Sequence, residues 1–248
     1  MAGRVRWTLS VLGAGVLMIA VAFLVWANDV VPASPAALAA LASDQAVNVT
    51  TEPWLTFAAA GPQPETGFIF YPGGKADSRG YAPLFRRIAA AGYLAVVVPM
   101  PLNLAVLGKD RAAEVMAAYP EVTRWVIGGH SLGGVVAVSF AGEHAPDVHG
   151  LALWASYPAG YDDLSGLDMP AVSIYGTADT FTTIAEVEEG KPLLPQRTRY
   201  IAIEGADHFQ FGDFADAPLN ATIARDEQHD AIIAATLEFL KEVPGLTF

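Results

Sequence analysis

Residues 128–134 read Gly-Gly-His-Ser-Leu-Gly-Gly and contain the pattern Gly-x-Ser-x-Gly around Ser131. The apolar run 125–127 precedes the pattern, and the apolar, helix-compatible stretch 135–140 follows it. This context predicts a nucleophile elbow, in which a strand turns sharply into a helix with the serine at the apex. The glycines are needed because the turn packs against itself and the serine backbone is strained. The alternative is a glycine-rich turn whose serine only caps the helix.

A nucleophile elbow constrains the rest of the chain, because folds that carry it supply an acidic residue and then a histidine after the serine. Residues 171–176 are expected to form a strand, and Asp179 follows it in a turn. Residues 199–205 are expected to form the next strand, and His208 follows that one. Open α/β sheets place their sites beyond the carboxyl ends of such strands. The order therefore predicts that Ser131, Asp179 and His208 act together.

The other histidines and acidic residues fit these roles less well. His130 lies inside the elbow and is expected to point away from Ser131, with a structural role. Asp207 is the direct neighbour of His208, and adjacent loop residues seldom face each other, so Asp179 is preferred and Asp207 remains the alternative acid. Three histidines are expected to be surface or capping residues near helix ends: His144, His149 and His229. Three acidic residues precede the strand and are expected in a solvated loop: Asp162, Asp163 and Asp168.

A serine nucleophile also needs an oxyanion hole made of two backbone amides. One is expected from Leu132, the residue directly after Ser131. The other is expected from the loop Pro-Gly-Gly-Lys at 72–75, which follows the apolar strand 67–71. Glycine allows a substrate to approach the backbone closely, so Gly74 is the first candidate and Lys75 the second. The same residues are also ordinary turn formers.

Four stretches together resemble the α/β-hydrolases, and in particular small, membrane-anchored bacterial members of that superfamily. These stretches are residues 70–75, 98–105, 128–134 and 205–212, and the resemblance covers about residues 36–242. It implies a triad of Ser131, His208 and Asp179. Two departures are visible, because Thr180 stands where glycine is expected after the acid, and Asp207 stands where members of this group often carry an amide. The resemblance fixes no substrate, since this fold hosts many reactions.

The N-terminal residues 7–27 contain no charged side chain, and as a helix they are long enough to cross the ~30 Å core of a bilayer. Arg4 and Arg6 precede this run, which predicts a cytoplasmic N-terminus at residues 1–6 and an extracytoplasmic remainder. The expectation is a retained single-pass membrane anchor at 7–27. The alternative is a signal peptide cleaved after Ala27, which would give a secreted protein.

Composition and the absence of certain motifs exclude several kinds of binding site and partner. The chain has no cysteine, so disulfides, thiolate metal sites and lipid attachment through cysteine are ruled out. A net charge of −12, from 26 acidic and 14 basic residues, makes nucleic acid an improbable partner. No dinucleotide or P-loop motif is present, because Ala76 follows Lys75 where a P-loop needs serine or threonine. No histidine pair suggests a metal, so neither a cofactor nor a metal is expected.

After the anchor, residues 28–45 are rich in alanine and proline and are expected to be a linker that ends in a short helix at 36–42. Residues 46–248 are expected to form one catalytic domain. The fold class is α/β: an α/β-hydrolase fold with a mostly parallel twisted sheet and helices on both faces. First strands are expected around 47–49 and 54–57, central strands at 93–98 and 151–154, and helices at 81–91 and 226–241.

The segment between Trp154 and Ala171 is too short for the lid domain that many α/β-hydrolases insert there. An open, shallow site is therefore expected, which favours small or accessible substrates. The pocket is expected to be lined by Met100, Leu102, Asn103, Tyr157, Phe181 and Phe209.

The function expected from these features is hydrolysis of carboxylic esters through an acyl-enzyme intermediate on Ser131. Lactone or amide hydrolysis, or acyl transfer to an acceptor other than water, uses the same triad and stays open. A hydrolase-like binding protein without activity is the remaining alternative. The expected partners are a small ester-like molecule and, through the N-terminal helix, a membrane.

Overall fold

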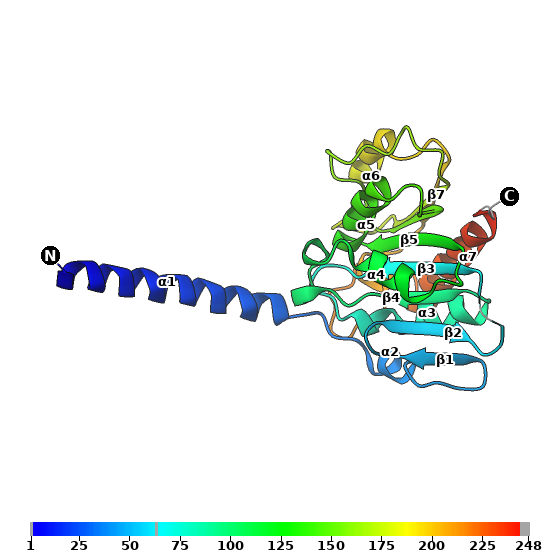
Figure 1. Ribbon diagram of the computed structural model, residues 1–248. Helices are drawn as coiled ribbons and strands as arrows, with labels where there is room; N and C mark the ends of the chain where they lie inside the picture. The colour runs from blue at the N-terminus through cyan, green and yellow to red at the C-terminus, as the bar shows by residue number, and fades with distance from the viewer. Residues whose placement is uncertain (1, 63, 244–248) are drawn as a thin grey trace.

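The computed structural model describes residues 2–62 and 64–243 of the chain, and the side chains of 13–62 and 64–243. Eight strands of this part form one sheet (Figure 1): β1 (Val47–Thr50), β2 (Leu55–Ala59), β3 (Thr66–Tyr71), β4 (Leu94–Val97), β5 (Arg124–His130), β6 (Gly150–Trp154), β7 (Ala171–Gly176) and β8 (Thr198–Ile203). Their order is β1-β2-β4-β3-β5-β6-β7-β8. Only β1 with β2 and β2 with β4 pair antiparallel, and every other pair is parallel. The predicted mostly parallel sheet is confirmed.

Helices cover both faces of the sheet, as predicted. The α-helices of the described residues are α1 (Ala2–Asn28), which does not pack on the sheet, α2 (Pro35–Ala39), α3 (Ala82–Ala90), α4 (Arg111–Ala118), α5 (Leu132–Glu143), α6 (Ile184–Gly190) and α7 (Arg225–Glu242). Five short 3-10 helices join them: η1 (Ser78–Tyr81), η2 (Pro101–Asn103), η3 (Ala105–Leu107), η4 (Lys191–Leu193) and η5 (Phe209–Phe211). The central strands carry apolar residues without alternation because both of their faces are buried.

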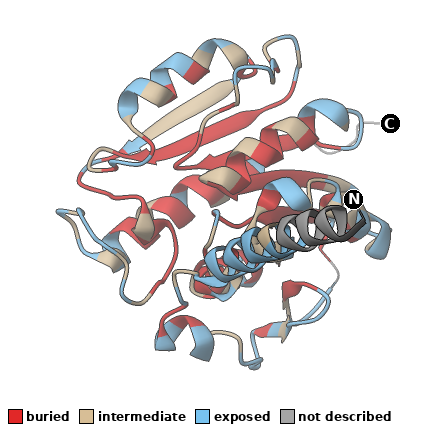
Figure 2. Ribbon diagram, turned by 90° about the vertical axis from the view of Figure 1, so that its left-hand side faces the viewer, coloured by how far each residue is buried: buried red, intermediate tan, exposed pale blue. Residues whose placement is uncertain are grey.

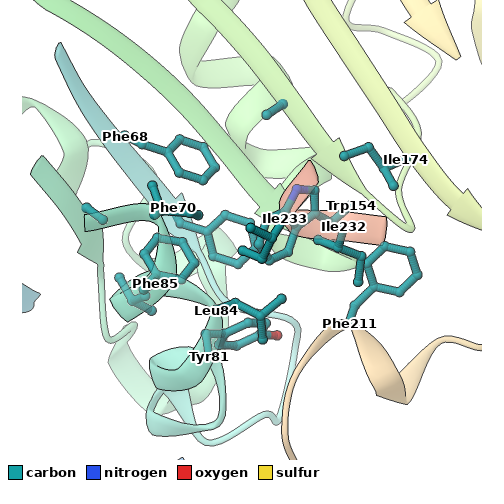
Figure 3. Close-up of a cluster of buried hydrophobic side chains, with 14 of the residues drawn as sticks. Phe68, Phe70, Tyr81, Leu84, Phe85, Trp154, Ile174, Phe211, Ile232 and Ile233 are labelled. Carbon is teal, nitrogen blue, oxygen red and sulfur yellow. The ribbon is translucent and has the colours of Figure 1, made fainter. Parts of the chain in front are cut away.

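Two hydrophobic cores result, one on each face of the sheet. The first lies between the sheet and helices α3 and α7, and Figure 3 shows its aromatic centre. There the rings of Phe70 and Trp154 lie 4.6 Å apart, and Phe68 stacks on Phe85 at 5.5 Å. The second core packs α4 and α5 on the opposite face, with Ala112 and Val115 of α4 and residues 136–138, 140 and 141 of α5 contributing. The cores fix the carboxyl ends of β3, β5, β7 and β8, where the expected site residues follow.

The connection from β6 to β7, residues 155–170, contains neither helix nor strand. A packed lid domain is therefore absent from this position, in agreement with the length of the segment. The connection from β7 to β8, residues 177–197, carries α6 and η4.

Helix α1 projects away from the sheet (Figure 1), and its described side chains are exposed nearly all round (Figure 2). Val16 and Ile19, for example, are 68% and 73% exposed. Among the residues whose side chains are described, no helix combines the length and the apolar character needed to cross a membrane. That description begins at residue 13, so side chains 7–12 of the predicted anchor lie outside the described part.

The predicted linker, residues 28–45, lies on the surface of the domain and makes specific contacts with it. Val31 forms a parallel bridge with Ala76, and Ala33 forms an antiparallel bridge with Phe214. The short helix of this segment is α2, whose first turn is capped by the Ser34 hydroxyl accepting from the amide of Ala37 at 3.0 Å.

Candidate active site

Ser131 lies at the sharp turn between β5 and α5, with a φ of +51° and a ψ of −125°. A side chain in this left-handed region is strained, and such strain is typical of a nucleophile elbow. The flanking glycines are required by close packing. A Cβ on Gly129 would lie 2.3 Å from the carbonyl carbon of Gly133, and one on Gly133 would lie 2.0 Å from the carbonyl oxygen of Tyr71.

Further hydrogen bonds hold the turn in place. The amide of Ser131 donates to the carbonyl of Trp154 at 3.1 Å, and the hydroxyl of Ser156 donates to the carbonyl of Ser131 at 2.8 Å. The side chain of Ser131 makes no capping hydrogen bond to α5. The interpretation of Ser131 as a mere helix cap is therefore not supported by its geometry.

Asp179 and His208 lie together, as the sequence predicts. Nδ1 of His208 is 2.8 Å from Oδ2 of Asp179, and both side chains are buried. The second carboxylate oxygen of Asp179 accepts from the amides of Phe181 at 2.7 Å and Thr182 at 2.8 Å. Because both of its oxygens accept hydrogen bonds, the Asp179 carboxylate has a fixed orientation. The bond to Nδ1 then fixes the orientation of the His208 imidazole ring.

The two loops that carry this pair are joined to each other directly. The amide of Ala178 donates to the carbonyl of Ala206 at 2.9 Å, and the amide of Gly205 donates to the hydroxyl of Thr177 at 2.8 Å. A Cβ on Gly176 would lie 2.2 Å from the carbonyl oxygen of Ala206, so only glycine permits this approach. The backbone contact brings Asp179 within reach of His208.

Asp207, the alternative acid, has a different environment. Its Oδ1 accepts from the amide of Gln210 at 2.9 Å, and its Oδ2 accepts from the amides of Asn220 at 2.7 Å and Ala221 at 3.2 Å. These bonds tie the loop after β8 to the segment ahead of α7. The Asp207 carboxylate therefore holds two backbone segments together, whereas the Asp179 carboxylate contacts His208.

A small cavity of about 150 Å³ opens at the elbow. Two of the six predicted pocket residues, Phe181 and Phe209, line it, and the other four (Met100, Leu102, Asn103 and Tyr157) are not among its walls. The hydroxyl of Tyr157, for instance, donates to Oε1 of Glu186 at 3.1 Å. The full lining is Val31, Gly73, Gly74, Ala76, His130, Ser131, Phe181, His208, Phe209 and Phe214.

Two backbone amides beside this cavity are free to receive an oxyanion. Leu132 is the first residue of α5, and neither its amide nor that of Gly74 makes a hydrogen bond within the described residues. The two segments are adjacent, since a Cβ on Gly74 would lie 3.0 Å from Cδ2 of Leu132. The amide of Lys75 donates instead to the carbonyl of Asn103 at 2.9 Å. This favours Gly74 over Lys75 as the second donor.

His130 makes a contact that the sequence analysis did not predict. Its ring lines the same cavity, with its centroid 4.5 Å from that of His208, and it stacks on Phe211. Burial, together with the neighbouring His208, lowers the pKa of His130 well below its ordinary value. No feature of the sequence indicates this contact, because it joins residues far apart in the chain.

The other histidines have local structural contacts. His144 stacks on Phe140 at the end of α5, and Nδ1 of His149 accepts from the amide of Trp125 at 3.2 Å. His229, expected near the surface, is instead buried. Across residues 2–62 and 64–243, no cluster of three or more His, Asp or Glu side chains is arranged to hold a metal ion.

The sheet topology and the turn at Ser131 are those of an α/β-hydrolase, and a comparison with known protein families gives the same class. The model of the alpha/beta hydrolase family matches residues 67–230, and the chain belongs to that family. Among solved structures, a protein from Thermoplasma acidophilum described as a predicted CIB-like hydrolase aligns with a TM-score of 0.59 and 16% identity, covering 80% of this chain and 99% of its own.

An esterase domain from a Rhodothermus marinus protein aligns with a TM-score of 0.58 and 15% identity, covering 77% of this chain and 93% of its own. At such identities the likeness shows the fold alone. No curated protein matches this chain in sequence.

Proposed function

We propose that this protein is a serine hydrolase that cleaves carboxylic esters, with Ser131 as nucleophile, His208 as general base and acid, and Asp179 as the group that orients His208. The observation that carries the proposal is the 2.8 Å contact between His208 and a doubly fixed Asp179, beside a cavity that Ser131 also lines. This is the chemistry of a triad recognised by geometry and chain order.

In the first step, His208 takes the proton of the Ser131 hydroxyl as Oγ attacks the carbonyl carbon of the ester. Collapse of the tetrahedral intermediate breaks the bond to the alcohol, which leaves with the proton from His208. Water then attacks the acyl-enzyme in the same way and releases the acid and free Ser131. Asp179 stabilises the imidazolium that exists between these transfers.

The amides of Leu132 and Gly74 are the proposed oxyanion hole. Both are unpaired within the described residues, and the Leu132 amide also lies at the positive end of the α5 dipole. A preorganised donor of this kind contributes about 3–4 kcal/mol to transition-state stabilisation. No cofactor is required for this reaction.

The cavity suggests the class of ester. A volume of about 150 Å³ accommodates a short acyl group, and the exposed ring of Phe181 at its rim leaves the rest of a substrate in solvent. The esterase domain among the similar folds agrees with ester hydrolysis. We therefore propose small or accessible esters as substrates.

The same triad also serves lactone or amide hydrolysis and acyl transfer, and these are the alternatives to ester hydrolysis. A fluorophosphonate probe should label wild-type protein at Ser131 and should leave Ser131→Ala unlabelled, with both proteins showing equal thermal stability. Labelling of neither protein would identify a hydrolase-like binding protein. A screen of p-nitrophenyl esters, lactones and amides then selects the reaction, and added alcohols reveal transfer through new ester products.

We further propose that residues 7–27 anchor the protein in the cell membrane with the catalytic domain outside the cytoplasm. The charge-free run after Arg4 and Arg6 supports this orientation. The exposed apolar side chains of the described part of α1 are consistent with a lipid environment. Secretion after signal cleavage is the alternative.

A further inference from the structure

Residues 31–34, here called the strap, lie along residues 72–77, the loop that carries Gly74 and is here called the oxyanion loop. The amide of Val31 donates to the carbonyl of Lys75 at 2.8 Å, and the carbonyl of Val31 accepts from the amide of Asp77 at 3.0 Å. These two bonds form the parallel bridge between Val31 and Ala76. The strap thus pairs with the proposed oxyanion loop as a short strand would.

The other edge of the strap pairs with a different part of the domain. The amide of Ser34 donates to the carbonyl of Asp213 at 2.9 Å, and the carbonyl of Pro32 accepts from the amide of Ala215 at 2.9 Å. Arg225 of α7 holds Asp213 through an ion pair. The strap therefore connects the oxyanion loop to a rigid part of the domain.

The oxyanion loop needs such support because its backbone is strained. Lys75 has a φ of +57°, and Asn103, whose carbonyl accepts from the Lys75 amide, has a φ of +55°. Residues other than glycine adopt this conformation only when surrounding contacts impose it. The bond from Val31 to the carbonyl of Lys75 is one of those contacts.

Asn103 also joins the loop to helix α1. Its side-chain amide donates to the carbonyl of Ala27 at 3.1 Å, near the end of α1. The ammonium of Lys75 lies 4.9 Å from the ring centre of Trp26 and 3.7 Å from the carboxylate of Asp29. The end of α1 therefore contacts the oxyanion loop directly through Trp26 and indirectly through Asn103.

We propose that the strap is a positioning element of the active site, which holds the Gly74 amide toward the cavity and couples the placement of α1 to catalysis. The proposal rests on the proposed function of the Gly74 amide. Val31 also lines the cavity beside Ser131 and Gly74, so the strap supplies part of the wall as well. Residues 31–34 therefore belong to the structure of the proposed site.

Full-length Val31→Pro removes the amide that bonds Lys75 and tests the proposal. Because loss of one oxyanion donor costs about 10²–10³ in kcat, partial misplacement of Gly74 should lower kcat by about tenfold or more. Hydrogen exchange of the peptide covering residues 73–77 should accelerate at the same time. The matched control is Val30→Pro, since the Val30 amide makes no hydrogen bond within the described residues. Its kcat and loop exchange should equal those of the wild type.

Two further variants test separately the Val31 side chain in the cavity wall and the link from Asn103 to α1. Val31→Ala trims the cavity wall but keeps the amide, so it should change KM while leaving exchange of the loop unaltered. Asn103→Gly tolerates the positive φ and removes only the bond to Ala27, so it should lower kcat less than Val31→Pro. Should Val31→Pro fail to fold, Asn103→Gly still tests the coupling through the same two measurements.

Wild-type loop exchange and kcat in both Val31→Pro and Asn103→Gly would overturn the proposal, as would equal losses in Val30→Pro. If wild-type protein is not labelled by a fluorophosphonate, the proposed function fails. Loop exchange, which needs no activity, then decides separately whether the strap holds residues 73–77.

Discussion

The phenol oxygen of Tyr81 lies 2.8 Å from Nδ1 of His130 and accepts from the amide of Gly73 at 3.0 Å. Burial, together with the neighbouring His208, lowers the pKa of His130 and favours the neutral form of its ring. A neutral ring beside His208 leaves that residue free to take up a proton during catalysis.

Tyr81→Phe removes both bonds and leaves the Gly73 amide and Nδ1 of His130 buried without partners. We expect a loss of about 1–3 kcal/mol in unfolding free energy, measured by urea denaturation. A lower kcat should accompany it, because the loop that carries Gly74 loses its contact with the core. The control is Tyr93→Phe, at a half-buried tyrosine remote from the cavity. Equal stability and kcat in Tyr81→Phe and wild type would contradict the role of this bond.

Asp179→Asn should lower kcat by about 10⁴-fold, because an amide favours the wrong tautomer of the histidine. Asp207→Asn should leave kcat nearly unchanged but lower the melting temperature, since one of its oxygens accepts from two backbone amides that a side-chain NH₂ would oppose. Steady-state kinetics with a p-nitrophenyl ester and thermal unfolding measure both effects. The opposite pattern would assign the acid to Asp207.

Stability should fall as the solution is acidified from neutral pH. Burial lowers the pKa of His130 and that of His229 in the folded protein. Below the ordinary pKa of histidine, near 6.5, the unfolded chain therefore binds more protons than the folded one, and the unfolding free energy decreases with decreasing pH. In His130→Gln the decrease between pH 7.5 and 5 should be smaller than in wild type, as measured by urea titrations. An unchanged slope would show that His130 does not contribute.

Activity should be highest with short acyl chains and should decline beyond medium lengths, because the cavity measures about 150 Å³ and no lid domain extends it between β6 and β7. Phe181→Ala opens the rim and should shift the preference toward longer chains with little loss of stability, since this ring is 57% exposed. A p-nitrophenyl ester series provides the measurement. A sharp rise in rate at the micelle threshold, or a preference for long-chain triglycerides, would contradict an open, small site.

The mature protein should remain in the membrane fraction, and protease added to spheroplasts should digest its catalytic domain. The physical basis is the charge-free run 7–27 behind Arg4 and Arg6. Edman sequencing distinguishes the alternatives, because a chain beginning at Asn28 indicates signal cleavage and an intact start indicates an anchor. Protection of the catalytic domain from external protease would exclude both the membrane anchor and the cleaved signal peptide.

Local features of the sequence determined the fold class and most of the candidate site. Glycines around Ser131 predict a sharp turn because only a residue without a side chain fits there, and the strands that precede Ser131 and Asp179 are mostly apolar and buried. The order of serine, acid and histidine then placed all three at one edge of the sheet. These properties depend on neighbours in the chain, so the sequence alone contains them.

Only the tertiary structure decided which groups meet. The choice of Asp179 over Asp207 depends on side-chain direction in two loops that Gly176 brings together, and the choice of Gly74 over Lys75 depends on a carbonyl supplied by Asn103. The contact of His130 with the cavity and the pairing of residues 31–34 with neighbouring loops also join distant segments. The alanines and prolines at 28–45 indicate a linker because composition reflects only the local conformational preferences of the chain. The backbone pairing of this segment with the domain depends on residues that are distant in sequence and become neighbours only on folding.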